Sequence, residues 1–277
     1  MAVALITGSS SGIGQLSALE LARRGHRVFA SMRNLESARY IVAKAEKENL
    51  SVETVRLDVT DADSVTAAIA HVIERAGRLD VLVNNAGFGS SGPVEDYSDE
   101  DLKQVFETNF FGALRVTRAA LPAMRAQRSG TIIMVSSISG LRTFPFLAVY
   151  SASKFALEAA SNGLRHELRQ FGIRVVLVEP GNFKTRAGAN FHYPSRSKDG
   201  FAKGTSDPLY DRLWKNYTAG RTLALGDASD VAGVIADASE AENPKARYIV
   251  GKDAEEIAAL GSEDFERVIT ERMTLPN

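Results

Sequence analysis

Short apolar runs alternate with helical patterns along most of the chain, and few folds are compatible with such alternation. The expected strands are Val3–Thr7, Arg27–Ser31, Val52–Leu57, Val81–Val83, Thr131–Ser136, Val175–Glu179 and Tyr248–Val250. The expected helices are Gln15–Arg24, Leu35–Glu48, Asp61–Ala76, Ser98–Gln127 (capped by Ser98 and kinked or interrupted at Pro122), Val149–Phe171 and Asp227–Ala241. Because parallel strands need crossover helices, the pattern predicts an α/β fold with a doubly wound parallel sheet and helices on both faces.

Composition narrows the classes of function. The chain has 277 residues with 33 Lys and Arg against 34 Asp and Glu, a formal net charge of −1 that gives no indication of a nucleic-acid or anionic-membrane partner. No composition break or repeat divides the chain, so we predict a single domain over residues 1–277. There is no Cys, which excludes disulfides and zinc–thiolate sites, and the four His show no metal spacing, so no metal is expected.

We find no sign of export or membrane insertion. No apolar run approaches the roughly 18 residues of a membrane span. The first strand-like segment begins at Ala2, directly after Met1, which leaves no room for a targeting segment. We therefore expect a cytoplasmic protein.

A glycine-rich turn joins the first expected strand to the first expected helix. It reads T-G-S-S-S-G-I-G over Thr7–Gly14. Backbone N–H groups at a helix start can hold a pyrophosphate, and glycines allow the tight turn and the close approach. The spacing differs from the commoner G-x-G-x-x-G, and a flexible loop is the alternative. The position between a strand and a helix favours dinucleotide binding.

A second polar group surrounds the fifth expected strand. Ser137 follows the apolar run Thr131–Val135, and Tyr150 and Lys154 are four residues apart, so they share a helix face. A hydroxyl at a strand end, facing a Tyr–Lys pair, can hold a carbonyl oxygen and donate a proton to it. Ser136 is the rival to Ser137 for this role.

Other candidate residues lie at the same edge of the predicted sheet. Open parallel sheets bind ligands at the carboxyl ends of their strands. Five residues lie at such ends: Gly8, Asp58, Asn84, Ser137 and Pro180. We therefore expect the binding site along this edge.

The alternation stops after the sixth strand, at about residues 186–223. A long irregular insert there is more often a lid or binding segment than an inert loop. It carries the ring side chains Phe191, His192, Tyr193, Phe201, Tyr210, Trp214 and Tyr217, while Phe88, Leu141, Phe144 and Phe146 lie near other strand ends. These side chains suggest a pocket for an apolar or ring-bearing ketone or alcohol, although they could instead pack the lid onto the body. His192 is expected to face substrate or solvent.

A set of motifs occurs in a fixed order along nearly the whole chain. They are T-G-x3-G-x-G at Thr7–Gly14, Asp58, N-N-A-G at Asn84–Gly87, Asn109, Ser137, Y-x3-K at Tyr150–Lys154 and P-G-x3-T at Pro180–Thr185. Y-x3-K also occurs at Tyr40 and at Tyr248, but only Tyr150 has a Ser thirteen residues before it. From Val3 to about Val250 the chain resembles a short-chain dehydrogenase/reductase of the single-domain type, which implies a Rossmann-type fold and nicotinamide-linked hydride transfer.

The resemblance implies a role for each matching residue. Ser137 and Tyr150 would donate hydrogen bonds to the substrate oxygen, Tyr150 would be the acid/base, and Lys154 would lower its pKa and hold the ribose. Asn109 would support a proton-relay water, and the alternative is an Asn that caps or kinks its helix. The implied cofactor contacts are Gly8, Ser10, Ser11, Gly12, Ile13, Gly14, Arg33, Asp58, Val59, Asn85, Ala86, Gly87, Tyr150, Lys154, Pro180, Gly181, Phe183 and Thr185. The alternative to cofactor binding is a plain turn for Asn84–Gly87 and a structural hydroxyl for Thr185.

The end of the second strand indicates which nicotinamide cofactor is used. An acidic residue there accepts from the ribose 2′-OH of NAD, whereas this chain has Ser31-Met32-Arg33 and no carboxylate until Glu36. Arg33 can pair with a 2′-phosphate, which predicts NADP(H) over NAD(H). A solvated surface charge is the alternative for Arg33. Many NADP-using relatives carry a second basic residue in the glycine-rich turn, where this chain has Ser10 and Ser11.

Three other functions compete with NADP(H)-dependent carbonyl reduction. They are NAD-dependent alcohol oxidation, NADPH sensing without catalysis, and nucleotide-sugar epimerisation or dehydration. The T-G-x3-G-x-G spacing and the small remainder after Gly181 count against the last. The resemblance also implies a homodimer or homotetramer, with the helices Ser98–Gln127 and Val149–Phe171 as contact surfaces.

Overall fold

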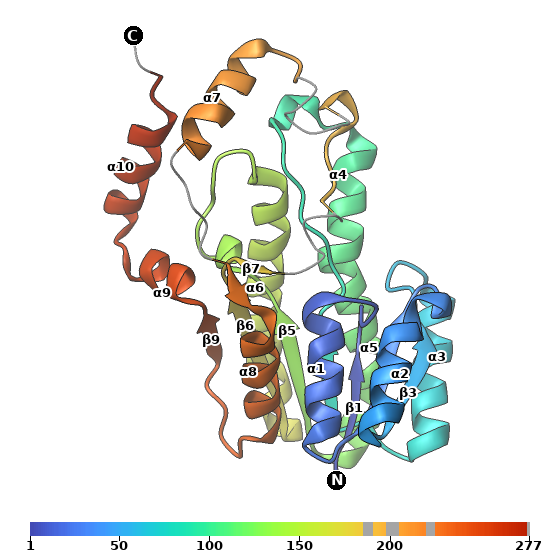
Figure 1. Cartoon of the computed structure of the whole chain (residues 1–277). Coiled ribbons are helices and arrows are strands. Elements are labelled where there is room, and N and C mark those ends of the chain that lie inside the picture. The colour runs from blue at the N-terminus through green and yellow to red at the C-terminus, as the bar shows by residue number, and fades with distance from the viewer. Residues whose placement is uncertain (185–190, 198–204, 220–224, 276–277) are drawn as a thin grey trace.

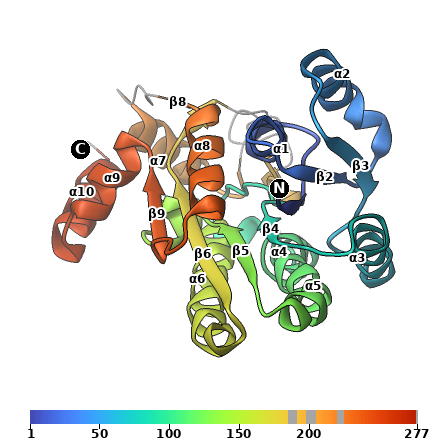
Figure 2. The ribbon, with the colours of Figure 1, turned by 90° about the horizontal axis from the view of Figure 1, so that it is seen from below.

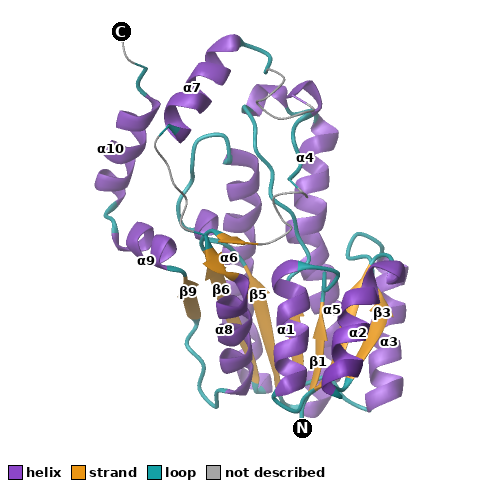
Figure 3. Cartoon of the chain, viewed as in Figure 1, coloured by secondary structure: helices purple, strands orange, loops and turns teal. Residues whose placement is uncertain are grey.

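The structure is a computed structural model that describes residues 1–184, 191–197, 205–219 and 225–275. Its centre is a seven-stranded sheet in the order β3-β2-β1-β4-β5-β6-β9, and every neighbouring pair is parallel (Figures 1 and 3). The strands are β1 Val3–Ile6, β2 Arg27–Met32, β3 Val52–Arg56, β4 Val81–Asn84, β5 Gly130–Val135, β6 Ile173–Pro180 and β9 Arg247–Val250. The strand order reverses between β1 and β4, so the predicted doubly wound α/β fold is confirmed.

Helices cover both faces of this sheet (Figure 2). The first face carries α1, α2 and α8, and the second carries α3, α5 and α6. Their bounds are α1 Gly12–Arg23, α2 Arg39–Glu48, α3 Ala62–Ala76, α4 Asp99–Phe106, α5 Ala113–Gln127, α6 Ala148–Leu168, α7 Pro208–Thr218, α8 Ala228–Glu240, α9 Lys252–Ala259 and α10 Ser262–Met273. The first residues of the expected helix Leu35–Glu48 form a separate 3-10 turn, Leu35–Ala38.

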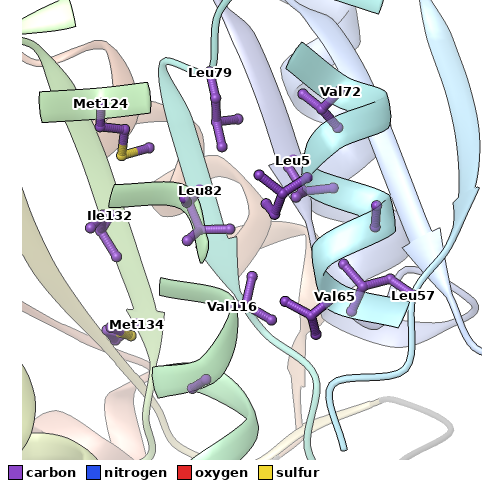
Figure 4. Close-up of a cluster of buried hydrophobic side chains, with 14 of the residues drawn as sticks. Leu5, Leu57, Val65, Val72, Leu79, Leu82, Val116, Met124, Ile132 and Met134 are labelled. Carbon is purple, nitrogen blue, oxygen red and sulfur yellow. The ribbon is translucent and has the colours of Figure 1, made fainter. Parts of the chain in front are cut away.

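The strands are apolar on both sides because their side chains enter two different cores. In β1, Val3 and Leu5 belong to the cluster under α3, α5 and α6, part of which Figure 4 shows. Ala4 and Ile6 belong to the cluster on the opposite face. Successive side chains of a strand alternate between its faces, so a sheet buried on both sides needs nearly continuous apolar strands.

The expected helix Ser98–Gln127 consists of three parts. Ser98 caps the first part, α4, through a reciprocal capping box with Asp101, so the expected N-cap is confirmed. A π-helical turn, Glu107–Gly112, then joins α4 to α5. The helix α5 continues through Pro122, so the irregularity lies at the π turn and Pro122 does not interrupt the helix. Such turns are frequent at functional sites.

Beyond the carboxyl edge of the sheet lie α7, α9 and α10 (Figure 1). The expectation of irregular chain over residues 186–223 is wrong for α7, whose first turn has Asp207 as N-cap and Pro208 at its start. The two-residue strands β7, Phe183–Lys184, and β8, Gly226–Asp227, pair with each other in parallel. Among the described residues, no helix combines the length and the apolarity needed to cross a bilayer.

Candidate functional site

The ends of β1 and β4 are joined where the strand order reverses. Thr7 is buried, and its Oγ1 accepts the backbone N–H groups of Asn85 and Ala86, both at 3.0 Å. In return, Asn85 Nδ2 donates to the carbonyls of Thr7 at 2.8 Å and of Gly8 at 3.2 Å. The glycine-rich turn and the N-N-A-G segment therefore form one hydrogen-bonded unit. Asn84 itself points inward and donates to Thr117 Oγ1 at 2.9 Å.

Two glycines of the glycine-rich turn are packed too tightly to carry a side chain. Gly8 has φ +70°, and a Cβ there would lie 2.8 Å from Ala86 Cα. A Cβ on Gly14 would lie 2.3 Å from Asn85 Nδ2 and 2.5 Å from the Gly8 carbonyl oxygen. The bare backbone at these two positions is therefore what lets the turn pack against Ala86 and Asn85.

The helix that follows this turn begins without an anionic cap. The side chain of Ser11, its N-cap, makes no capping hydrogen bond, and the first turn of α1 holds no acidic residue. Ser10, Ser11, Gly12 and Ile13 are partly exposed along the turn. Uncapped N–H groups and the positive end of the helix dipole suit a phosphate group, so the turn fits a dinucleotide pyrophosphate.

The structure brings Ser137 and Tyr150 together. Ser137 caps the 3-10 turn Ile138–Gly140, where its Oγ accepts the N–H of Ser139 at 3.1 Å. Its hydroxyl lies close enough to the Tyr150 phenol, in the first turn of α6, to lower the pKa of that phenol. The rival Ser136 is turned away, since a Cβ built on Gly140 would lie 2.7 Å from Ser136 Oγ.

Lys154 lies one turn after Tyr150 and is buried. Its Nζ donates to the Val135 carbonyl at 2.9 Å and lies 5.8 Å from the centroid of the Tyr150 ring. Burial lowers the pKa of Lys154 to about 8, and the negative charge of Glu158 opposes this shift. Burial also raises the pKa of Tyr150, against a smaller lowering by the Ser137 hydroxyl. The protein groups named here therefore keep the phenol protonated at neutral pH.

Asn109 occupies the π-helical turn and holds the loop after β4. Its Oδ1 accepts the N–H of Phe88 at 3.0 Å, and its Nδ2 donates to the Phe88 carbonyl at 3.0 Å and to Ser153 Oγ at 3.2 Å. A Cβ on Gly87 would lie 3.0 Å from Asn109 Oδ1 and 3.8 Å from Lys154 Nζ. Asn109, Gly87 and Lys154 are thus neighbours, although they are far apart in the sequence.

Three further candidates follow β2 and β3 in the sequence. Arg33 directly follows β2, is exposed, and has no ion-pair partner among the described residues. Asp58 is partly exposed, and its Oδ1 accepts the N–H and the hydroxyl of Thr60 at 3.0 and 2.8 Å. Val59 is buried and faces Gly112 of the π turn, where a Cβ would lie 2.7 Å from its Cγ2.

The last group of candidates follows β6. Pro180 ends this strand, and a Cβ on Gly181 would lie 2.2 Å from Asp253 Oδ1. Phe183 lies in β7 and packs against Gly226. Thr185 lies outside the described residues, as do the greater part of residues 186–204 and residues 220–224.

The described part of the insert is anchored by two buried aspartates that the sequence did not mark as functional. Asp101 accepts from the Ser195 N–H at 3.0 Å and contacts His192 Nε2 at 2.9 Å, and Asp96 accepts from Ser197 Oγ at 2.8 Å. His192 therefore contacts a carboxylate of the body. The sequence predicted that it faces substrate or solvent, and did not predict this contact. Asp101 also accepts from the N–H and the hydroxyl of Ser98, so one carboxylate joins the start of α4 to the insert.

A small apolar cavity lies between the insert and the body. Its volume is about 200 Å³. It is lined by Gly92, Pro93, Val94, Pro145, Phe146, Ala148, Tyr210, Leu213 and Met273. Ala148, at the start of α6, is the lining residue contributed by the helix that carries Tyr150, and neither Ser137 nor Tyr150 lines the cavity. Tyr210 and Leu213 come from α7, the helix that the sequence did not reveal.

Comparisons with known proteins show similarity to short-chain dehydrogenases in both sequence and structure. The family model described as short chain dehydrogenase matches residues 2–193. Estradiol 17-beta-dehydrogenase 1 of Rattus norvegicus is 36% identical over 271 residues, covering 95% of this chain and 77% of the relative. A short-chain dehydrogenase from Streptomyces avermitilis has a TM-score of 0.81 and 33% identity, covering 98% and 94%. An actinorhodin polyketide ketoreductase bound to NADPH has a TM-score of 0.74 and 32% identity, covering 90% and 95%.

Proposed function

The chain belongs to the short-chain dehydrogenase family of oxidoreductases, and from that premise we propose that it reduces an apolar or ring-bearing ketone with NADPH. The observation that carries the proposal is the contact of Ser137 with Tyr150 beside the buried Lys154. Together these groups provide two hydroxyl donors for one carbonyl oxygen and a nearby cation. The glycine-rich turn adds a fitting place for a dinucleotide.

The two hydroxyls act on the oxygen that becomes negative. When bound, the reduced nicotinamide supplies the hydride. Ser137 and Tyr150 donate hydrogen bonds to the carbonyl oxygen and stabilise the alkoxide character that develops there. Tyr150 then transfers its phenolic proton to that oxygen. A phenol whose pKa is raised by burial is reliably protonated before the reaction, as this direction requires.

Lys154 and Asn109 would support the proton transfer from Tyr150. A charged Lys154 favours the phenolate left after proton transfer, because an opposite charge nearby stabilises the ionised form. Lys154 also lies next to Gly87, where it can hold the nicotinamide ribose. Asn109 keeps the loop at Phe88 in place, and we propose that it also supports the water that returns a proton to Tyr150.

Preference for NADP(H) rests on Arg33. The nearest carboxylate after β2 is Glu36, whose backbone N–H and Oε2 are both held by the side chain of Asn34. The exposed Arg33 guanidinium is therefore the charged group best placed for a ribose 2′-phosphate. Such a charge-assisted hydrogen bond contributes about 1.5–3 kcal/mol.

The nature of the substrate rests on the cavity beside α6. Its lining is apolar, which suits rings or alkyl chains attached to the reacting carbonyl. The similarity to an estradiol dehydrogenase and to a polyketide ketoreductase supports the same class of substrate. A cavity of about 200 Å³ is smaller than most drug-sized ligands need, so we expect it to take one part of the substrate.

A graded ketone series tests the proposal. NADPH oxidation is followed with ketones of increasing apolar size, from acetone through cyclohexanone to a tetralone and a steroid ketone. We expect kcat/KM to rise with apolar size and to be higher with NADPH than with NADH. Equal rates across the series would contradict the substrate class, and faster turnover with NADH would contradict the cofactor.

A further inference from the structure

Two buried glutamates and an arginine meet beside α6, one turn further along the face that carries Tyr150 and Lys154. Glu158 is on α6 one turn after Lys154, Glu179 is fully buried in β6, and Arg247 is in β9. Arg247 Nη1 donates to Glu158 Oε2 at 2.8 Å and also to Glu179 Oε1. One guanidinium therefore serves two carboxyl groups.

The other two carboxyl oxygens have no protein donor. Glu158 Oε1 and Glu179 Oε2 are buried and find no hydrogen-bond partner among the described residues. Because one guanidinium nitrogen contacts both carboxyl groups, the two groups lie close together. Two buried carboxylates that share one cation repel each other when both are ionised, which favours a proton on one of them. Burial and the adjacent Glu158 charge raise the pKa of Glu179 to about 8, consistent with a proton held at neutral pH.

The position of the remaining negative charge matters for Lys154. The charge of Glu158 raises the pKa of the buried Lys154, while burial lowers it. The other charged groups facing the pair are cationic: Arg247 from β9, and Arg165 on α6, which donates to two backbone carbonyls. Glu158 is thus the carboxylate that favours the ammonium form of Lys154.

We propose that Glu158 and Glu179 share one proton, and that this proton keeps the negative charge of the pair on Glu158, where it holds Lys154 in its charged form. Glu158 and Glu179 are positioning residues that act through Lys154. The first half of the proposal stands on the contacts alone, and the link to turnover rests on the proposed reductase function. Gly140 packs against Glu158, since a Cβ there would lie 3.0 Å from Glu158 Cγ and 3.2 Å from Glu158 Oε1.

Two isosteric variants separate the roles of the two glutamates. Glu158→Gln and Glu179→Gln each leave one carboxylate with Arg247, so both keep the same net charge as the protonated pair. They differ in where the charge lies. In Glu179→Gln the amide replaces the shared proton as a donor to Glu158, whereas Glu158→Gln moves the charge to Glu179, away from Lys154.

Unfolding as a function of pH detects the shared proton without any assay of activity. A raised pKa means that the folded chain keeps a proton which unfolded Glu179, with an ordinary value near 4.5, has already lost. Wild-type stability should therefore fall as pH rises from about 5 to 8, relative to both variants. Parallel pH dependences of the melting temperature in all three proteins would overturn the shared proton.

The pH profile of turnover tests the link to Lys154. An opposite charge nearby shifts a pKa by roughly 1–3 units, so the basic limb of kcat in Glu158→Gln should move about one unit lower. Glu179→Gln should keep the wild-type limb. If the basic limb of kcat lies at the same pH in both variants, Glu158 does not act on turnover through Lys154, and the stability result still stands. Wild-type chain that turns over no ketone, with the stability difference present, would instead reject the reductase proposal.

Discussion

At the scale of single residues, the site depends on burial more than on pairwise charge. Tyr150 ionises to an anion and Lys154 to a cation, and burial disfavours the ionised form of both. It therefore raises the pKa of Tyr150 and lowers the pKa of Lys154. Before the reaction the phenol is therefore a proton donor, and the charge of Glu158 favours the ammonium form of Lys154. The sequence predicted Tyr150 and Lys154 from their spacing, but it could not show Glu158, which has no motif.

Cofactor choice is also decided by one residue. Arg33→Asp removes the cation and places a carboxylate near the ribose, so it should weaken NADPH binding relative to NADH by about 10- to 150-fold. Fluorescence titration with each cofactor measures this ratio. Arg118→Asp, at an exposed position on α5, makes the same change of charge on the opposite face of the sheet and should leave the ratio unchanged. If the Arg33 variant keeps the wild-type ratio, Arg33 does not bind the 2′-phosphate.

At the scale of elements, regular periodicity was predictable and local exceptions were not. The predicted strands and helices of the sheet layers were correct, because the spacing of apolar residues follows which side chains are buried. The π-helical turn at Glu107–Gly112 has no comparable signal, since its sequence also fits an ordinary helix. The helix α7 was missed because its polar face and short length resemble a loop, although Asp207 and Pro208 are a typical helix start.

The glycine-rich turn gives a prediction at this scale. Gly14→Ala would place a methyl group 2.3 Å from Asn85 Nδ2 and 2.5 Å from the Gly8 carbonyl oxygen, so the turn must shift. We expect cofactor affinity to fall at least tenfold and the free energy of unfolding to drop by about 1–3 kcal/mol, the usual cost of overpacking.

The matched control for Gly14→Ala is Gly233→Ala in α8. A Cβ there meets nothing within 4 Å, so alanine should stabilise the helix by about 0.5–1 kcal/mol and leave cofactor binding unchanged. Urea unfolding and NADPH titration of the two variants measure both effects. Wild-type affinity in Gly14→Ala would show that the close packing of this turn is not needed for binding.

At the scale of the whole molecule, the sheet assembles residues that are far apart in the chain. Alternation of strands and helices predicted the doubly wound sheet, and it indicates the edge where we expect ligands to bind, because parallel topology brings the strand ends together. It could not predict which side chains meet across elements. Glu158, Glu179 and Arg247 come from α6, β6 and β9 and meet only in the folded chain.

Assembly is a further prediction at this scale. Phe111 and Phe155 are 48% and 42% exposed, and they lie on the π turn and on α6, the helices expected to form contacts between subunits. We expect a homo-oligomer by light scattering, and Phe111→Asp should shift it towards monomer. Leu35→Asp, at a 45% exposed position outside these helices, should not. A monomeric wild-type chain would contradict this prediction.

The central claim is that Tyr150 supplies the proton for NADPH-dependent reduction. Tyr150→Phe removes one hydroxyl and little else, so NADPH affinity should stay within about twofold while kcat falls by roughly 10²–10⁴, the usual contribution of a general acid. Single-turnover NADPH oxidation with a ring ketone, beside an NADPH titration of the same sample, measures both quantities. Turnover at the wild-type rate in Tyr150→Phe would contradict the account.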